Sequence, residues 1–447
     1  MNKIITMVSG MTVFALIGVV GCGTFPPSGS TNATTQSSNA RDKSNPSVGN
    51  TVSSSSSKQS SYTNTLGNTT STHKSDNEKV TAPVQLTKIQ MSNKLDGWGE
   101  FDDGNNIRIL STKDDGDKWN VVTTIPNTAT LRFGHNGLAW YATETGGHSP
   151  TVRVHFTKDW GKHWAVSNEL QLPSNHADRL QLLFAPGQQN GWLAVIAGGM
   201  NSSRTLELWK STDGGAQWSL ISKDNPSDML LGFQDSVHGW AEWSHAGSPF
   251  ASEFESPKSS KNSSEVEPPA ALYRTTNGGE SWKPQFLPVP RRLIVHNGLA
   301  SLSNMTWFGR DGLMEVSFGS DKLPYQKWGL YSTTDGGVHW SLHLVNGVSN
   351  NYGHETQQVT FDLATPNNLW ETVTKLSQSS SHAAYKANST TLYHSLGAGQ
   401  KWTAVGKTPV PFEIVQFVSP SIGFGLTSKN RTLYRTLDGG QSWTIVH

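Results

Sequence analysis

From residue 85 to residue 447 the chain consists of short runs in which apolar and polar residues alternate, and Gly, Asn and Asp separate the runs. Runs such as ALYRT (271–275) and GLYST (329–333) have the two-residue period of a half-buried β-strand. Long stretches with a helical period do not interrupt them. The pattern predicts an all-β protein of short strands and tight turns.

One turn sequence follows these strands seven times. It reads Ser or Thr, any residue, Asp, any residue, Gly, two further residues and Trp. The third position is occupied by Asp114, Asp159, Asp213, Asn277, Asp335, Gly397 and Asp438, and the closing tryptophans are Trp119, Trp164, Trp218, Trp282, Trp340, Trp402 and Trp443. Consecutive tryptophans are 41 to 64 residues apart, a period typical of propeller blades.

The residues of this turn suit the tip of a β-hairpin. The Asp oxygen can accept hydrogen bonds from nearby backbone N–H groups. The Gly adopts a positive φ at little cost, and the Trp is large enough to cover the base of the hairpin. Because Asn277 keeps an acceptor oxygen and Gly397 has none, we expect the sixth turn to be the loosest.

A second, weaker pattern precedes each turn: Gly or Asn followed by an apolar residue, as in GWGEF at Trp98 or GWAEW at Trp240. It suits a turn into another strand, so each unit contains four antiparallel strands. Seven units predict a seven-bladed β-propeller over residues 85–447. No strand is left over for exchange between the ends, so we expect the first and last blades to close the ring by packing.

Two polar, Ser-rich insertions interrupt the units at residues 244–271 and 375–390. Both fall between the second and third strands of their blades, so they should emerge on one face of the ring. We expect them to be mobile, either as tolerated surface insertions or as functional loops.

The N-terminal 22 residues have the pattern of a signal peptide. Lys3 precedes a short apolar stretch, and the sequence VVGC ends at Cys22, the one cysteine of the chain. This ending resembles the lipobox of bacterial lipoproteins, which implies lipidation of Cys22; an uncleaved membrane anchor is the alternative. Residues 23–84 are rich in Ser, Thr and Asn and predict a disordered tether. We therefore expect lipid anchoring at the extracytoplasmic face of the cell membrane.

Composition excludes one class of partner. Charged residues make up 15% of the chain and the formal net charge is +1, without a basic stripe, so we expect no nucleic-acid partner.

The seven turns resemble the Asp-box, or bacterial-neuraminidase, repeat. Together with the Gly-Trp pattern and the LYRTxDGG sequence, they make residues 85–447 most similar to the photosystem II stability/assembly-factor family of propellers and its non-photosynthetic bacterial relatives. This resemblance implies a propeller that binds a membrane protein during assembly, without catalysis.

Motifs for common enzyme chemistry are absent from the sequence. It contains no G-x-S-x-G, no H-E-x-x-H and no phosphate-binding loop, and it lacks the Arg-Ile-Pro motif of sialidases. We therefore expect a non-catalytic binding or assembly scaffold with no catalytic residues, metal or cofactor, and with a protein or envelope component as partner. The alternative is a carbohydrate-binding or glycoside-hydrolase-type propeller, similar to sialidases or xyloglucanases.

Overall fold

The computed structural model describes residues 85–146, 150–172, 179–197, 205–223, 229–242, 272–285, 287–288, 299–319, 327–344, 355–378 and 385–446. The predicted signal peptide, Cys22 and the predicted tether lie outside these ranges, and so does the insertion at 244–271. No helix within the described ranges is long and apolar enough to cross a membrane.

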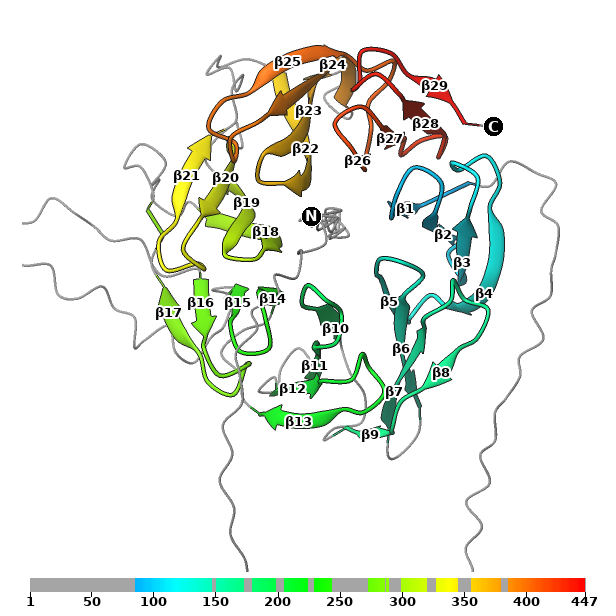
Figure 1. The fold of residues 1–447 in the computed structure, drawn as a ribbon, viewed down its shortest axis with the longest axis vertical. Helices are drawn as coiled ribbons and strands as arrows, with labels where there is room; N and C mark the ends of the chain where they lie inside the picture. The colour runs from blue at the N-terminus through cyan, green and yellow to red at the C-terminus, as the bar shows by residue number, and fades with distance from the viewer. Residues whose placement is uncertain are drawn as a thin grey trace, which may run out of the picture. The chain divides into compact units, whose positions relative to one another are not determined.

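The described strands form seven antiparallel sheets around a ring, which confirms the all-β, seven-bladed prediction (Figure 1). In each sheet the strands follow chain order from the centre of the ring outward, and we number these sheets as blades 1 to 7. The innermost strands are β1 (Lys88–Met91), β5 (Thr130–Phe133), β10 (Arg179–Phe184), β14 (Met229–Phe233), β18 (Leu299–Phe308), β22 (Glu355–Thr365) and β26 (Ile414–Phe417).

The remaining strands complete the blades. The second strands are β2 (Gly97–Asp102), β6 (Ala139–Thr145), β11 (Gly191–Ala197), β15 (Gly239–Glu242), β19 (Asp311–Gly319), β23 (Asn368–Gln378) and β27 (Gly423–Leu426). The third strands are β3 (Asn106–Thr112), β7 (Thr151–Thr157), β12 (Thr205–Ser211), β16 (Leu272–Thr275), β20 (Lys327–Thr333), β24 (Tyr385–Ser395) and β28 (Leu433–Thr436). The outer strands are β4 (Asn120–Pro126), β8 (Ala165–Val166), β13 (Ser219–Ser222), β17 (Lys283–Gln285), β21 (Ser341–Leu344), β25 (Thr403–Lys407) and β29 (Thr444–Ile445). Blade 2 carries one more strand, β9 (Leu170–Gln171), which pairs with β7.

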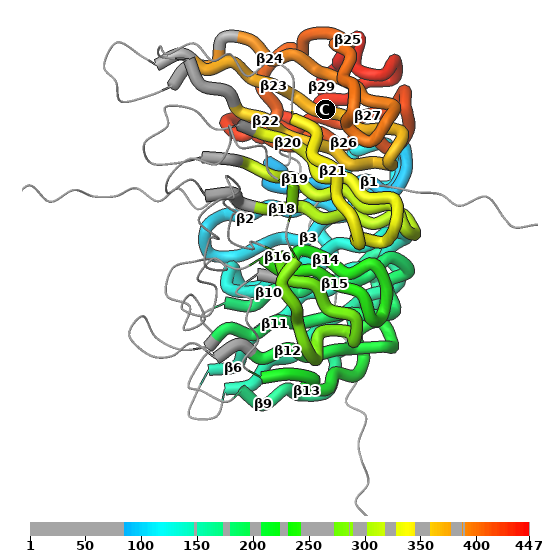
Figure 2. The backbone as a smooth tube through the Cα atoms, turned by 90° about the vertical axis from the view of Figure 1, so that its left-hand side faces the viewer, coloured from blue at the N-terminus to red at the C-terminus, as the bar shows by residue number. Residues whose placement is uncertain are grey.

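Antiparallel pairing gives the ring two different faces. The connections from first to second strand and from third to fourth strand lie on one face, which we call the turn face. The connections from second to third strand, and from each blade to the next, lie on the other, which we call the loop face. Figure 2 shows the strands running between these two faces. The seven repeated turns all join third to fourth strands, so all lie on the turn face.

The hydrophobic core is divided among the seven interfaces between neighbouring blades. Each interface contains one apolar cluster, and each cluster includes the closing Trp of one repeated turn. Trp218 of blade 3, for example, packs with Trp140 and Val154 of blade 2. The closing Trp therefore does more than cover its own hairpin, because it also joins its blade to the preceding one.

Blades 7 and 1 close the ring without exchanging a strand, as expected. The side chain of Gln416 in β26 accepts from Met91 N at 2.8 Å and donates to Met91 O at 3.1 Å. On the turn face, Arg435 Nη1 lies 2.7 Å from Asp115 Oδ2. Leu86 and Phe424 belong to the apolar cluster between these two blades.

The structure corrects the prediction for the insertion at 375–390. Strand β23 continues to Gln378 and β24 begins at Tyr385, so most of this segment extends the hairpin of blade 6. The Thr374 and Thr390 hydroxyls hydrogen bond at 2.9 Å across the two strands and are buried. Thr favours strands through its β-branched side chain, so this stretch forms sheet despite its polar composition. Residues 379–384 lie outside the described residues.

Candidate functional site

Six of the seven repeated turns share one set of hydrogen bonds. The Asp or Asn Oδ1 accepts from the hydroxyl residue two positions earlier at 2.8 to 3.0 Å and from the backbone N–H four positions later at 2.9 to 3.0 Å. The same hydroxyl accepts from the N–H of the second turn residue after the Asp or Asn, a Gly, at 2.8 to 3.2 Å. The six acceptors are Asp114, Asp159, Asp213, Asn277, Asp335 and Asp438.

The sixth turn lacks most of these bonds. Among the described contacts, Ser395 Oγ accepts only from Gly397 N, at 3.4 Å. Ala398 takes a positive φ of 48°, a region that glycine occupies more readily. The missing carboxylate thus leaves the backbone of this turn with fewer partners than in the other six.

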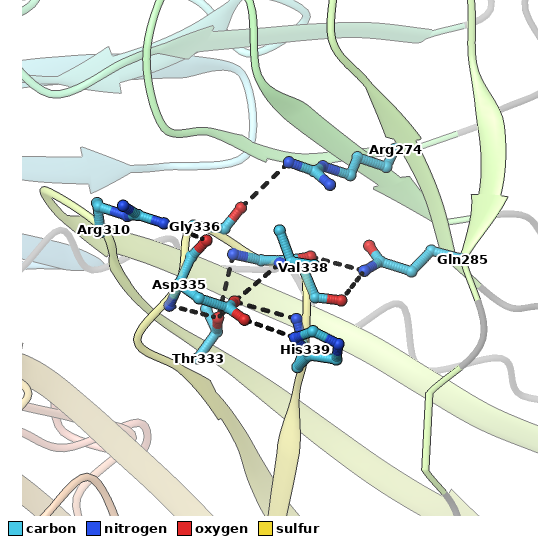
Figure 3. A network of polar contacts seen from close by, with 9 residues as sticks. Arg274, Gln285, Arg310, Thr333, Asp335, Gly336, Val338 and His339 are labelled. Atoms are coloured by element: carbon cyan, nitrogen blue, oxygen red, sulfur yellow. Dashed lines mark hydrogen bonds and ion pairs between the residues drawn. The ribbon is translucent and has the colours of Figure 1, made fainter.

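The repeated turns also connect blades. Around Asp335, Arg274 of blade 4 donates to Gly336 O at 3.4 Å, and Gln285 of blade 4 donates to Gly337 O at 2.6 Å (Figure 3). In blade 3, Trp192 Nε1 donates to Gly278 O in the turn of blade 4 at 2.8 Å. These turns are therefore structural joints of the ring.

The turn carboxylates have little capacity for acid–base chemistry near neutral pH. Backbone and side-chain hydrogen bonds from His339 hold the pKa of Asp335 far below its usual value. Hydrogen bonds from Ser442 lower the pKa of Asp438 to about 2. Both groups stay ionised and occupied as acceptors, so neither can act as a catalytic acid near neutral pH.

Three other carboxyl groups, all in blades 5 and 6, have the opposite property. Burial raises the pKa of Glu315, Asp362 and Glu371 to about 8 in each case. A carboxyl group that stays protonated near neutral pH can serve as a general acid, and such shifts concentrate at functional sites. These residues form the candidate site.

Asp362 and Glu371 are 0% exposed, and Glu315, which is 7% exposed, is buried as well. It lies in β19, and its Oε2 accepts from Asn304 Nδ2 at 2.8 Å and from Ser303 Oγ at 3.4 Å. Both donors belong to β18, the innermost strand of blade 5. The negative charge of Asp362 further raises the pKa of Glu315, so the two carboxyl groups interact electrostatically.

Asp362 occupies the innermost strand of blade 6, opposite Trp370. Its Oδ2 accepts from Phe417 N of blade 7 at 2.6 Å, and its Oδ1 has no hydrogen-bond partner among the described residues. Burial outweighs this single hydrogen bond and raises the pKa of Asp362 to about 8. Trp370 belongs to the apolar cluster between blades 6 and 7, so Asp362 faces that interface and not the one that Glu315 faces.

Glu371 lies on β23 opposite Phe361 and Tyr393. Neither of its carboxyl oxygens has a hydrogen-bond partner among the described residues. Phe361 belongs to the apolar cluster between blades 5 and 6, and so does Leu330, which pairs with Glu315 in blade 5. Cross-strand partners share one side of a sheet, so Glu315 and Glu371 face the same interface from opposite blades.

Sequence reasoning missed all three carboxyl groups. The signal was an acidic residue inside a buried strand, in DGLMEV around Leu313 and in NNLWETV around Trp370. That signal is ambiguous, because Glu100 occupies the position of Glu315 in blade 1 and is paired there with Lys88 at 2.8 Å. Only the structure distinguishes Glu100, which has an ion-pair partner, from Glu315, which accepts hydrogen bonds from neutral groups.

A metal site does not stand out. Within the described residues no group of three or more His, Cys, Asp or Glu side chains could hold a metal ion. His163 and His339 instead pair with Asp159 and Asp335 of their own turns.

Comparisons with known proteins found similar solved structures at low sequence identity. No family model matches the chain, and no curated protein matches its sequence. Similar solved structures include a GH74 enzyme of Niastella koreensis, 11% identical over 81% of this chain and 71% of that one, with a TM-score of 0.32. The GH74 xyloglucanase of Xanthomonas campestris is 10% identical over 80% and 66% of the two chains, with a TM-score of 0.38. A PL25 ulvan lyase is 11% identical over 80% and 92%, with a TM-score of 0.43.

This finding corrects two expectations. The compared propellers are glycoside hydrolases and a polysaccharide lyase, which overturns the expectation of a non-catalytic binding or assembly scaffold and the expectation that the chain is not an enzyme. The likeness itself is one of fold. The chemistry proposed below rests on the chain's own carboxyl groups.

Proposed function

We propose that this propeller is a carbohydrate-active enzyme that cleaves glycosidic bonds, with Glu315 as the proton donor. The observation that carries the proposal is Glu315, a buried glutamate whose carboxyl accepts hydrogen bonds from Asn304 and Ser303 and whose pKa is raised by burial to about 8. When a glycosidic bond breaks, the oxygen of the leaving sugar must be protonated, and a carboxyl group that is protonated near neutral pH can supply this proton. As part of the same proposal, we assign the repeated turns to the Asp-box type, which their shared hydrogen bonds support.

The proposed reaction uses one proton and one water molecule. Glu315 gives its proton to the glycosidic oxygen as the bond from that oxygen to the anomeric carbon breaks. Water adds to the anomeric carbon, and the proton it releases returns to the carboxylate of Glu315. Asp362 ionises only as the pH rises through about 8, and its charge then raises the pKa of Glu315, which favours the protonated form of the donor.

Turnover by variants tests the proposal. Residues 85–447 are incubated with a panel of soluble polysaccharides that includes xyloglucan, arabinan and ulvan, and new reducing ends are measured. We expect Glu315→Gln to lower turnover by about a thousandfold or more, because the donor proton is lost. The matched control is Glu207→Gln, which changes a buried glutamate of blade 3 and should keep full turnover.

The pH dependence gives a second readout. Turnover should fall above about pH 8, where Glu315 loses its proton. Asp362→Asn removes the charge that raises the pKa of Glu315, so this alkaline limit should move to lower pH. A folded protein that cleaves nothing in the panel, or equal loss in the Glu315 and Glu207 variants, contradicts the proposed function.

A further inference from the structure

The innermost strand of blade 5 carries an irregularity beside Glu315. The pairing of β18 with β19 shifts register between Ser303 and Met305, so Asn304 is an extra residue in β18. Asn304 has a positive φ of 43°, a conformation that residues other than glycine adopt at an energetic cost. Such bulges often redirect a side chain beside a functional site.

The redirected side chain is the one that reaches the proposed proton donor. Asn304 Nδ2 donates to Glu315 Oε2 at 2.8 Å, while the hydroxyl of Ser303 lies at 3.4 Å from the same oxygen. Among the described contacts Oε1 receives no hydrogen bond. An oxygen that accepts two donors is a poor place for a proton, so the proton of the neutral acid belongs on Oε1.

We propose that Asn304 is a positioning residue for Glu315: the bulge holds its amide against Oε2, so that Oε1 carries the proton and presents it to the substrate. This inference rests on the proposed function and adds to it which oxygen donates. The amide also stabilises the carboxylate that remains after the proton has left, since an N–H donor favours the charged form. Asn suits this position because, after glycine, it tolerates the left-handed region better than most residues.

Titration of Glu315 tests the inference without any substrate. Infrared difference spectra of the carboxyl C=O band, assigned with Glu315→Gln, report protonation between pH 5 and pH 10. The hydrogen bond from Asn304 lowers the pKa of Glu315, so Asn304→Ala should move the titration to higher pH. Ser303→Ala should move it less, because that hydrogen bond is longer.

The variant Asn304→Gly distinguishes the effect of losing the amide donor from the effect of backbone strain. Both Asn304 variants lose the donor, but glycine accepts the positive φ that alanine resists. We expect the two variants to shift the titration equally and to differ in thermal stability, with Asn304→Gly the more stable. Where the wild type turns over a polysaccharide, both should lower kcat about tenfold or more, with a smaller change in KM, because the donor is misplaced.

Two results would overturn the inference. One is a Glu315 titration that is unchanged in Asn304→Ala. The other is a shift in Asn304→Ala that is absent in Asn304→Gly, which would attribute the effect to backbone strain. Both results come from the titration of Glu315, which needs no turnover. A negative result in the polysaccharide panel can therefore be distinguished from evidence against the role of Asn304.

Discussion

The interface between blades 3 and 4 and the interface between blades 5 and 6 occupy equivalent places in the ring but differ in chemistry. Between blades 3 and 4, Trp192 stacks on Phe233 with centroids 3.6 Å apart, and Trp282 meets Phe233 edge-on at 6.1 Å. Between blades 5 and 6, Leu313 and Leu363 stand at the register positions of Trp192 and Phe233. The aromatic stack is missing there.

The same two interfaces differ in charge. Ala194 and Ala241 are buried between blades 3 and 4. At the corresponding strand positions between blades 5 and 6 stand Glu315 and Glu371. Replacing small apolar residues by buried carboxyl groups costs stability, so this interface is less well packed but contains groups that can bind protons. Functional sites often lie where a sequence departs from its own structural pattern.

The largest expected effect comes from breaking the aromatic interface. Trp192→Ala should lower the free energy of unfolding by about 3–5 kcal/mol, because it removes the stack on Phe233 and the hydrogen bond to Gly278 O. Chemical denaturation measures this loss. Leu313→Ala, at the equivalent position, is the comparison and should cost less; an equal or larger cost would contradict the contrast between the two interfaces.

Glu371→Gln should affect stability in a pH-dependent way. The pKa of Glu371 is raised to about 8 in the folded protein and is about 4.3 in an unfolded chain. Folding therefore favours the protonated form, and this favourable contribution is present below pH 4 and is lost as the pH rises toward 8. The loss is about 1.4 kcal/mol per pH unit.

Glutamine does not titrate, so the advantage of Glu371→Gln over the wild type should grow between pH 5 and pH 8. Urea denaturation at several pH values measures it, with Glu207→Gln as the control. Parallel stability curves for wild type and Glu371→Gln would show that Glu371 is ionised in the fold.

The smallest effects concern the repeated turns. Asp213→Ala removes the acceptor for Ser211 Oγ, Ala216 N and Gln217 N and should cost about 1–3 kcal/mol. Gly397→Asp adds the missing acceptor to the sixth turn, where a new Cβ meets no atom within 4 Å, so it should cost little or stabilise. Thermal unfolding measures both, and equal losses would contradict the acceptor role.

The fold was predictable from local patterns. The repeated turn, the alternation of its flanking strands and the period of the tryptophans predicted seven blades, and the structure confirms them. The role of the closing tryptophans between blades was not predictable, because hairpin spacing does not specify which neighbour a side chain contacts. The continuation of β23 and β24 through a Ser-rich segment was also missed, because composition outweighed the β-branched threonines.

The candidate site could not be predicted from the sequence, for a different reason. Glu100, Glu242 and Glu315 share one strand position, yet Glu100 pairs with Lys88 and Glu242 accepts from Leu302 N at 2.7 Å. The protonation state of each glutamate depends on partners that are distant in the chain, and the sequence does not show which residues these are. The lipid anchor at Cys22 and the tether stay predictions.

The closure of the ring has a consequence for how such a protein can change. Every blade is one continuous stretch of chain, and among the described strands no sheet pairs a strand of blade 7 with a strand of blade 1, whose contacts include Gln416 and Arg435. New termini placed between any two blades would leave each sheet whole. A gene of this design can therefore be circularly permuted, or can gain a duplicated unit, without dividing a sheet between its two ends.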